Sequence, residues 1–375
     1  MVKKRSKHCP YCGSHGTIKK AKRNGKRRYL CRTCGRWFSI YFTRHAFPFW
    51  LPYIDGEPYR PLGNELGLSP SQTYARVIQE LDQLPDNTWL SYTYCNRWSG
   101  ILHVDGKHIP TRHYVSPRWI WSVDFLRHDF PIGIFAPSEN LEAFLKFFRL
   151  LKTINYPLRV VIADDISPLR IALKHYYPKA KVQLCQTHYV ENIRQLLRIR
   201  TEDRYRVFFH HLITTVFPID ASQSAREAAL FQLYQRFGQH NPVIQRVLVD
   251  IHQRQTELWQ YQSIPLCPRT NNIIEAFNSH LKGRLKSIKR FQSFHSAERF
   301  MNAYLIRRRT KPFTDCEGYF TKFNGHVPLE NTIRKGLDYP SIPGFQEPET
   351  ERCRPSSAAR AASPMIRSAL TLPII

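Results

Sequence analysis

The sequence has no apolar run of the roughly 20 residues that a membrane-spanning helix needs. Its first residues, MVKKRSKHCPYC, have no apolar signal-peptide core. The GxxxxGK[ST] pattern of phosphate-binding loops is also absent. We therefore expect a cytoplasmic protein that is neither inserted in a membrane nor secreted through a signal peptide, and that is not a P-loop nucleoside triphosphatase.

Acidic residues are scarce. The 375 residues include 29 Asp and Glu against 56 Lys and Arg, a formal net charge of +27 that is spread along the whole chain. Such an excess predicts a polyanionic partner, and DNA or ribosomal RNA would both satisfy it. With 42% apolar residues the chain can bury a sizeable core, and its length predicts two or three domains.

Nine cysteines are present, and four of them form two close pairs near the amino terminus. Cys9 and Cys12 are separated by two residues, as are Cys31 and Cys34. This spacing predicts a tetrahedral structural Zn²⁺ site in a zinc ribbon and argues against a disulfide framework. Cations between the pairs would lie along a DNA backbone, although a ribbon that contacts only protein is the alternative. The cations predicted to contact DNA are Arg23, Lys26, Arg27 and Arg28.

The segment YRPLGNELGLSPSQTYARVIQELDQLP has the spacing of a helix-turn-helix. A short apolar helix is followed by a turn at Gly67 and a second helix, with Ser69 as its cap and Pro70 at its first position. In a helix-turn-helix the second helix enters the major groove. The residues predicted to face DNA are Ser71, Gln72, Tyr74 and Arg76.

From about residue 100 the pattern predicts an α/β core. ILHVDGKHI, RWIWSVDFL and DFPIGIFAP have the composition of three antiparallel strands, followed in order by a helix, the strand LRVVIADD, a helix capped at Ser167 and the strand KVQLCQTH. This is the element order of a ribonuclease H-like mixed sheet. A mostly helical stretch of about 190 to 265 then interrupts the core as an insertion.

Three acids stand at positions where such a core would gather them. Asp105 ends the first strand, Asp164 ends the fourth, and Glu275 lies on the helix after the insertion. Carboxylates that converge in this way suit Mg²⁺ or Mn²⁺, and two such ions would support an in-line phosphoryl transfer.

Each acid also has a purely structural interpretation. Asp105-Gly106 is a hairpin-turn signal. Asp164 and Asp165 could cap the following helix, and Asn272-x-x-Glu275 resembles a capping box. Asp124 lies on a predicted strand of the same sheet and is the alternative to Asp105 as the first catalytic acid.

The helix that carries Glu275 has two distinct faces. Its apolar residues recur at three- and four-residue steps and predict one buried face, formed by Ile274, Phe277, Leu281, Leu285 and Ile288. Glu275 shares the other face with cations that would hold phosphates beside the scissile one. The cations of this segment predicted to contact DNA are Lys282, Arg284 and Lys286.

The stretches HVDGKHI, IADDISPLRIALKHYYPKAKVQLCQTHYVENI and TNNIIEAFNSHLKGR resemble the DDE transposases of bacterial insertion sequences related to the Mutator-like class. The second stretch carries the pattern of the family at Asp164, Leu169, Ala172, Pro178, Cys185, His188 and Asn192. The spacing selects Asp164 over Asp165. The resemblance covers about residues 100 to 310 and implies a catalytic triad of Asp105, Asp164 and Glu275.

Together, the residue patterns and the resemblance predict a domain organisation and a set of ligands and partners. We expect a zinc ribbon (1–42), a helix-turn-helix (43–95), a core in two parts (96–190 and 266–312) around the insertion (191–265), and a partly disordered extension (313–375). The expected ligands are two Mg²⁺ or Mn²⁺ per active site and one structural Zn²⁺. The expected partner is double-stranded DNA, bound at the element ends and the target by a homodimer or larger synaptic complex in the bacterial nucleoid.

Two further residue sets have open roles. Cys185 and His188 have no second pair of ligands nearby in the sequence, so we expect them to support the active site rather than to form a zinc site. Trp259 would stack on a flipped base or, as the stronger expectation, pack in the core. A transposase-derived DNA-binding regulator and a ribonuclease H-like nuclease or resolvase remain the competing functions.

Overall fold

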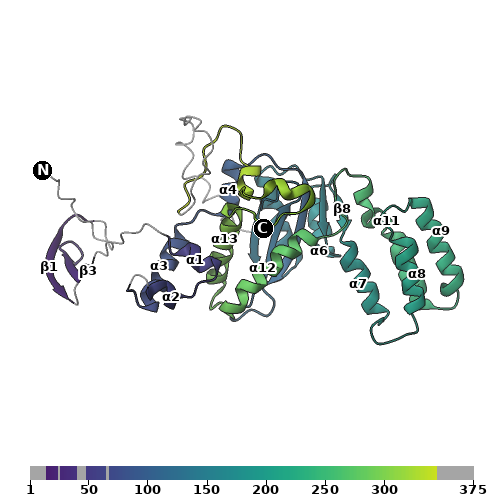
Figure 1. Ribbon diagram of the computed structural model, residues 1–375, viewed down its shortest axis with the longest axis horizontal. Coiled ribbons are helices and arrows are strands. Elements are labelled where there is room, and N and C mark those ends of the chain that lie inside the picture. Colours follow the sequence, from purple (N-terminus) through teal and green to yellow (C-terminus); the bar gives the residue numbers. More distant parts are fainter. Residues whose placement is uncertain (1–13, 24–25, 40–47, 65–66, 344–375) are drawn as a thin grey trace.

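The computed structural model describes residues 14–23, 26–39, 48–64 and 67–343 (Figure 1). Cys9 and Cys12 lie outside the described residues, as does most of the predicted C-terminal extension. A five-stranded sheet stands at the centre, with helices α1–α3 on one side of it and a lobe of helices that includes α7, α8, α9 and α11 on the other. No helix among the described residues is long and apolar enough to cross a membrane.

The central sheet is mixed and has the strand order β6-β5-β4-β7-β8. The first three strands in the sequence form an antiparallel meander, and β7 and β8 run parallel to β4. Both parallel connections contain a helix, as a parallel crossover requires. The strands are β4 (Ile101–His108), β5 (Arg118–Asp124), β6 (Gly133–Ala136), β7 (Val160–Ala163) and β8 (Lys181–Leu184).

Helices cover both faces of this sheet. Alternate residues of β5 point to opposite faces: Ile120 packs with Phe144 and Phe147 of α5, whereas Trp121 packs with Phe277 of α12. The sheet is therefore the middle of three layers. The helices of the two outer layers are α5 (Leu141–Thr153), α6 (Ser167–Tyr176), α12 (Asn272–Ile288) and α13 (Phe294–Thr310).

The predicted insertion is helical and has a hydrophobic core of its own. Trp259 is buried in that core beside Phe217, which confirms the packing expectation, and the Arg226 guanidinium lies 4.5 Å from the Trp259 ring centre. The α-helices are α7 (Gln186–Leu196), α8 (Arg206–Val216), α9 (Gln223–Leu233), α10 (Pro242–Gln253) and α11 (Gln255–Leu258). Shorter turns lie at η1 (Tyr234–Gly238) and η2 (Gln260–Gln262).

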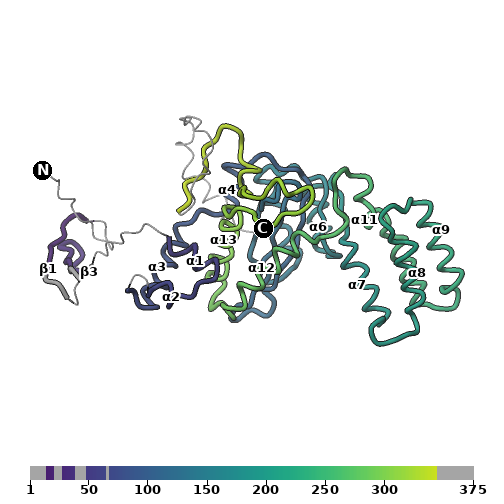
Figure 2. The backbone as a smooth tube through the Cα atoms, viewed as in Figure 1, coloured from purple at the N-terminus to yellow at the C-terminus, as the bar shows by residue number. Residues whose placement is uncertain are grey.

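The amino-terminal elements comprise a small antiparallel sheet and four helices (Figure 2). Ser69 caps α3 with a reciprocal bond to Gln72, and Pro70 is its first residue, as predicted. Val77 and Leu81 are buried in the same hydrophobic cluster as Phe277 of α12, so these helices share a core with the central layers. The elements are β1 (Thr17–Arg23), β2 (Lys26–Cys31), β3 (Trp37–Ser39), α1 (Trp50–Asp55), α2 (Tyr59–Asn64), α3 (Pro70–Asp82) and α4 (Asn87–Tyr94).

Two short turns, η3 (Gly318–Phe323) and η4 (Pro328–Asn331), follow α13. Leu329, in η4, packs into the hydrophobic cluster between the sheet and α5. The segment after α13 therefore completes the core rather than extending away from it.

Three local predictions were wrong. Asp105-Gly106 is not a turn, because β4 continues through it and Asp105 pairs with Trp121 of β5. Ser167 makes no capping bond, since α6 already begins at that residue. Asn272 and Glu275 form no capping box, because the helix begins at Asn272 and the preceding side chain, Asn271, turns into the core.

Candidate active site

The register of the sheet brings Asp105 and Asp164 together. Leu102 pairs with Val161 and His103 with Ile162 in the parallel β4–β7 ladder. Continuing that register by two residues sets Asp105 beside Asp164, which follows the last residue of β7. The two carboxylates are close enough for the charge of Asp164 to raise the pKa of Asp105.

Glu275 reaches the same place from α12. Nδ1 of His188 on α7 lies 2.7 Å from Oδ1 of Asp164 and 3.6 Å from Oε1 of Glu275. The histidine therefore links the two acids across the gap between the sheet edge and the helix. The close contact with the Asp164 carboxylate raises the pKa of His188 to about 11, although burial acts in the opposite direction.

Asp105 is held by two hydrogen bonds and is the most shielded acid of the group. Its Oδ1 accepts the Gly106 N–H at 2.8 Å, and its Oδ2 accepts from the Asn278 side chain one turn after Glu275. Burial, and then the neighbouring Asp164, raises the pKa of Asp105 to about 7. The site therefore holds its carboxylates in an environment that penalises their negative charge.

Three polar atoms at this site are shielded from solvent without an aligned hydrogen-bond partner: Asp164 Oδ1, His188 Nδ1 and Glu275 Oε1. The 2.7 Å separation of the first two is close, but its geometry is not that of a hydrogen bond. Unsatisfied oxygens next to a carboxylate with a raised pKa are what a divalent cation would relieve. The oxygen donors of Asp105, Asp164 and Glu275 fit Mg²⁺ or Mn²⁺.

A second group of potential metal ligands, which includes a cysteine sulfur and a histidine nitrogen, lies beside the acids. One ligand atom each from Asp164, Cys185 and His188 lie within 4.8 Å of one another. Cys185 is buried and its sulfur accepts the Asn271 N–H at 3.3 Å. This set lacks a fourth protein donor among the described residues, so a closed tetrahedral zinc site is not formed there.

The start of α12 is fixed by buried polar contacts that the sequence did not indicate. Asn271 contacts His103 Nδ1 at 2.6 Å and donates to the Val104 carbonyl at 3.2 Å. Because burial lowers the pKa of His103 to about 4, this histidine is neutral at physiological pH. These contacts fix the first turn of the helix, which carries Glu275, against β4.

The alternative acids have structural partners instead. Asp124 is fully buried, and its carboxylate accepts hydrogen bonds from Ser99, Arg127 and Tyr156. Asp165 forms ion pairs with Arg170 at 2.6 Å and Arg254 at 2.8 Å, and these arginines lower its pKa despite partial burial. The geometry therefore favours Asp105 over Asp124 and Asp164 over Asp165 as the acids of this site.

The sequence of this site was compared with those of known protein families. Residues 132–311, which include Asp164, His188 and Glu275, match the family model described as transposase, Mutator family. Through residues 132–311, just under half of its length, the chain is similar to the Mutator family of transposases. The transposase for insertion sequence element IS1201 of Lactobacillus helveticus is 24% identical over 171 residues, which are 44% of this chain and 44% of that relative.

A solved structure is also similar in part. It is a chain of a simian T-cell lymphotropic virus intasome in complex with the PP2A regulatory subunit B56 gamma, with 11% identity over 50% of this chain and 67% of that chain. Its TM-score of 0.21 is too low to support an argument about the fold of this chain.

A fourth acid, Glu139, lies near the site, and the sequence did not indicate it. It follows β6, and a Cβ atom at Gly106 would overlap its carboxyl group. Burial, and then Asp164, raises the pKa of Glu139, while Arg118, 3.5 Å away, opposes that effect. The Glu139 side chain therefore lies directly over β4 at Gly106, next to Asp105.

The cations predicted on α12 differ in their placement. Lys282 and Lys286 are exposed on the helix face that carries Glu275. Arg284 instead donates to the carbonyls of Tyr53 and Ile54 at 2.6 and 3.1 Å. Its guanidinium is occupied in holding α1 against α12, so the prediction that it contacts DNA does not fit the structure.

The predicted helix-turn-helix residues are mostly available. Ser71, Gln72 and Tyr74 are exposed on α3, although the Gln72 side chain accepts the Ser69 N–H in the capping box. Arg76 pairs with Glu80 at 3.1 Å and lies 4.9 Å from the Phe49 ring centre, so it is occupied within the helical unit.

The predicted ribbon is described only in part. Cys31 is buried, Cys34 is half-buried, and the Arg28 guanidinium lies 4.6 Å from the Trp37 ring centre. The side chains of Arg23, Lys26 and Arg27 lie outside the described residues.

Proposed function

We propose that this chain is a DDE transposase that binds the terminal inverted repeats of its insertion sequence and carries out two-metal DNA cleavage and strand transfer. The observation that carries the proposal is the convergence of Asp105 beside Asp164, and of Asp164 and Glu275 on His188, in and next to the segment that matches the Mutator-family model. The chain spans 44% of the length of its curated relative, so the activity is inferred from the site.

The strand order and crossovers of the central sheet support a ribonuclease H-like core interrupted by the helical insertion. In this proposal the three carboxylates hold two Mg²⁺ or Mn²⁺ ions. When bound, these ions would activate the attacking hydroxyl and stabilise the leaving oxygen. Lys282 and Lys286 hold the phosphates beside the scissile one.

The exchange needs no external energy source. A 3′-hydroxyl oxygen forms a bond to the target phosphorus while the bond from that phosphorus to the target 3′-oxygen breaks, so one phosphodiester replaces another. His188 orients the Asp164 carboxylate, and Asn278 orients Asp105. Both are positioning residues.

The amino-terminal elements would recognise the element ends. We assign Cys9, Cys12, Cys31 and Cys34 to one structural Zn²⁺ in a zinc ribbon, and α2 and α3 to a helix-turn-helix with Ser71, Gln72 and Tyr74 in the major groove. Joining two ends requires at least two active sites in one assembly, so the active form is a homodimer or larger synaptic complex on DNA.

Strand transfer tests the proposal directly. A labelled duplex carrying the inverted repeat that flanks the coding sequence is incubated with plasmid and Mg²⁺, for the wild type, Asp164→Asn and Glu275→Gln. We expect joined products with the wild type alone, while all three proteins bind the end duplex. End binding without cleavage by the wild type would favour a DNA-binding regulator.

A further inference from the structure

The turn between β4 and β5 and the turn between α12 and α13 are joined into one surface, here called the hairpin tip (residues 110–116 and 289–291). The two turns exchange backbone hydrogen bonds, Arg112 N to Phe291 O and Phe291 N to Pro110 O, both 2.9 Å long. The Tyr114 ring packs on Phe294, with centres 5.3 Å apart. The tip is therefore tied to the core on both sides.

The exposed side chains of the hairpin tip are cationic or apolar. Arg112, His113, Lys289 and Arg290 are exposed, and Val115 has 99% of its surface accessible. No acid occurs in residues 106–118 or 282–292. Among the described residues, none of these cations forms an ion pair with a carboxylate.

Two of these side chains occupy backbone positions that normally favour glycine. His113 has φ of 66° and Lys289 has φ of 63°. A residue with a side chain is strained in this left-handed region, and glycine would remove the strain. The tip therefore keeps a histidine and a lysine at turning points where the backbone alone would select glycine.

The tip lies at a definite distance from the acids. β4 and α12 run side by side from the Asp105–Asn278 contact to the Thr111–Phe291 bridge. The path along the helix, at about 1.5 Å per residue, is about 20 Å, and the path along the strand, at about 3.3 Å per residue, gives the same length. Lys282 and Lys286 lie on α12 between the two points.

We propose that the hairpin tip is a second DNA contact, in which Arg112, Lys289 and Arg290 hold the phosphates on either side of a minor groove and Val115 lies in that groove. This inference rests on the proposed function and adds the position of the bound duplex. At about 3.4 Å per base pair, the tip contacts DNA about six base pairs from the scissile phosphate. Apolar side chains at the end of a basic loop are suited to the minor groove.

Binding measurements separate the two kinds of contact. Fluorescence anisotropy with a labelled random-sequence duplex of roughly 40 base pairs, a length that exceeds the predicted span several-fold, is repeated over a range of salt. We expect Arg112→Ala to weaken binding about tenfold and to reduce the slope of log K against log salt by about one. Val115→Ser should weaken binding about threefold without changing the slope.

The matched controls are Arg246→Ala and Val249→Ser on α10, since both side chains are exposed on the helical insertion. They should bind as the wild type does. If the wild type binds with a steep salt dependence and the tip variants equal the controls, the hairpin-tip inference is wrong and the transposase proposal stands. If the wild type shows no salt-dependent binding to duplex DNA, both fail.

A photocrosslinking amino acid at position 115 locates the contact. We expect crosslinks centred about six base pairs from the phosphate at which the wild type cleaves or joins. The same amino acid at position 249 should give none. Crosslinks at the cleaved phosphate itself, or spread evenly over the duplex, would overturn the proposed position.

Discussion

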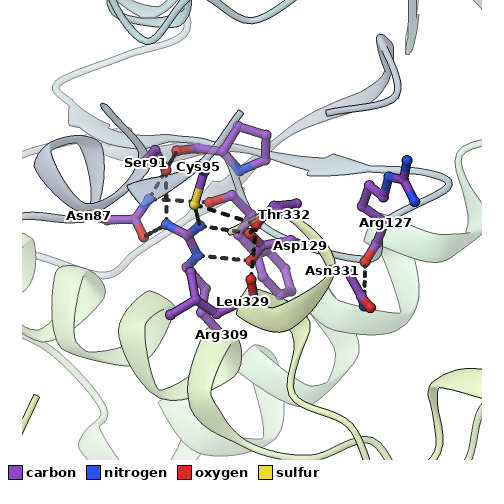
Figure 3. A network of polar contacts seen from close by, with 11 residues as sticks. Asn87, Ser91, Cys95, Arg127, Asp129, Arg309, Leu329, Asn331 and Thr332 are labelled. Atoms are coloured by element: carbon purple, nitrogen blue, oxygen red, sulfur yellow. Dashed lines mark hydrogen bonds and ion pairs between the residues drawn. The ribbon is translucent and has the colours of Figure 1, made fainter. Parts of the chain in front are cut away.

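Buried Asp129 and the half-buried acids of the candidate active site are satisfied in opposite ways. Asp129, between β5 and β6, receives both arms of the Arg309 guanidinium at 2.8 and 2.6 Å and a further bond from Thr332 (Figure 3). The remaining donors of Arg309 reach Asn87 and Ser91 at 3.0 and 2.8 Å, and its Nη2 atom also lies 3.1 Å from the Cys95 sulfur. The negative charge of Asp129 is therefore matched by the positive charge of Arg309 inside the protein.

At the acid site, His188 lies between Asp164 and Glu275, Asp105 neighbours Asp164, and one oxygen each of Asp164 and Glu275 has no aligned partner. Burial would lower the pKa of Arg309, but Asp129 raises it, whereas burial and Asp164 raise the pKa of Asp105. The first arrangement is stable without a ligand and joins α4, α13 and the segment after η4. In the proposed function, the second arrangement is completed by a divalent cation.

The largest effect on stability is expected at the matched pair. Arg309→Met leaves the Asp129 carboxylate buried without its partner and should cost about 3–5 kcal/mol. Urea unfolding followed by circular dichroism measures the loss. Arg198→Met, which removes the exposed pair with Glu202, is the control and should change stability little. Equal effects of the two substitutions would refute the assigned role of the network.

In contrast to Arg309→Met, Asp164→Asn should lower activity rather than stability. We expect strand transfer to fall on the order of 10³-fold, equivalent to about 4 kcal/mol of barrier, because the substitution removes a metal-binding charge. The variant should stay folded with little change in stability, since it relieves repulsion with Asp105 but also removes the carboxylate that raises the pKa of His188. A variant that is inactive only because it unfolds would contradict this expectation, and thermal unfolding distinguishes the two.

The raised pKa of Asp105 predicts a pH dependence. Because the folded-state pKa is about 7 and the unfolded value about 4, this group stabilises the fold below about pH 4, and that contribution is lost as the pH rises through about 7. Without added Mg²⁺, Asp105→Asn should therefore raise the melting temperature more at about pH 8 than at about pH 5. A difference in melting temperature between Asp105→Asn and the wild type that does not change with pH would show that the pKa of Asp105 is not raised in the folded protein.

Glu139→Gln should have the smallest effect on activity. Its carboxylate lies over Gly106 and is partly balanced by Arg118, so we expect strand transfer to fall no more than about tenfold. The concentration of Mg²⁺ needed for half-maximal activity should rise. Measuring that concentration for Glu139→Gln and for Glu142→Gln, on the first turn of α5, isolates the contribution of Glu139. Identical values would remove Glu139 from the site.

The sequence predicted the elements of the central sheet because strands and helices depend on local patterns, whereas the three acids were indicated by the family resemblance. Asp105 illustrates the limit: the dipeptide Asp105-Gly106 has the local signature of a turn, and only pairing with β5 makes it part of a strand. Glu139 and Asn278 could not be found, because their proximity to Asp105 depends on packing between distant segments.

The charge pattern was similarly incomplete. Lys282, Arg284 and Lys286 look equivalent in the sequence, yet Arg284 is held by the carbonyls of α1 while the lysines are exposed. The hairpin tip joins two segments that are far apart in the chain, so no local motif could reveal it.

A cation-binding measurement shows whether the group of Asp105, Asp164 and Glu275 takes up a divalent ion. Mn²⁺ binding to the zinc-loaded protein, followed by calorimetric titration, is compared among the wild type, Asp164→Asn and Asp124→Asn. We expect the wild type to bind Mn²⁺. Asp164→Asn should lose this binding, and the folded fraction of Asp124→Asn should retain it. Equal binding by the wild type and Asp164→Asn, or none by the wild type with or without DNA, would contradict this expectation.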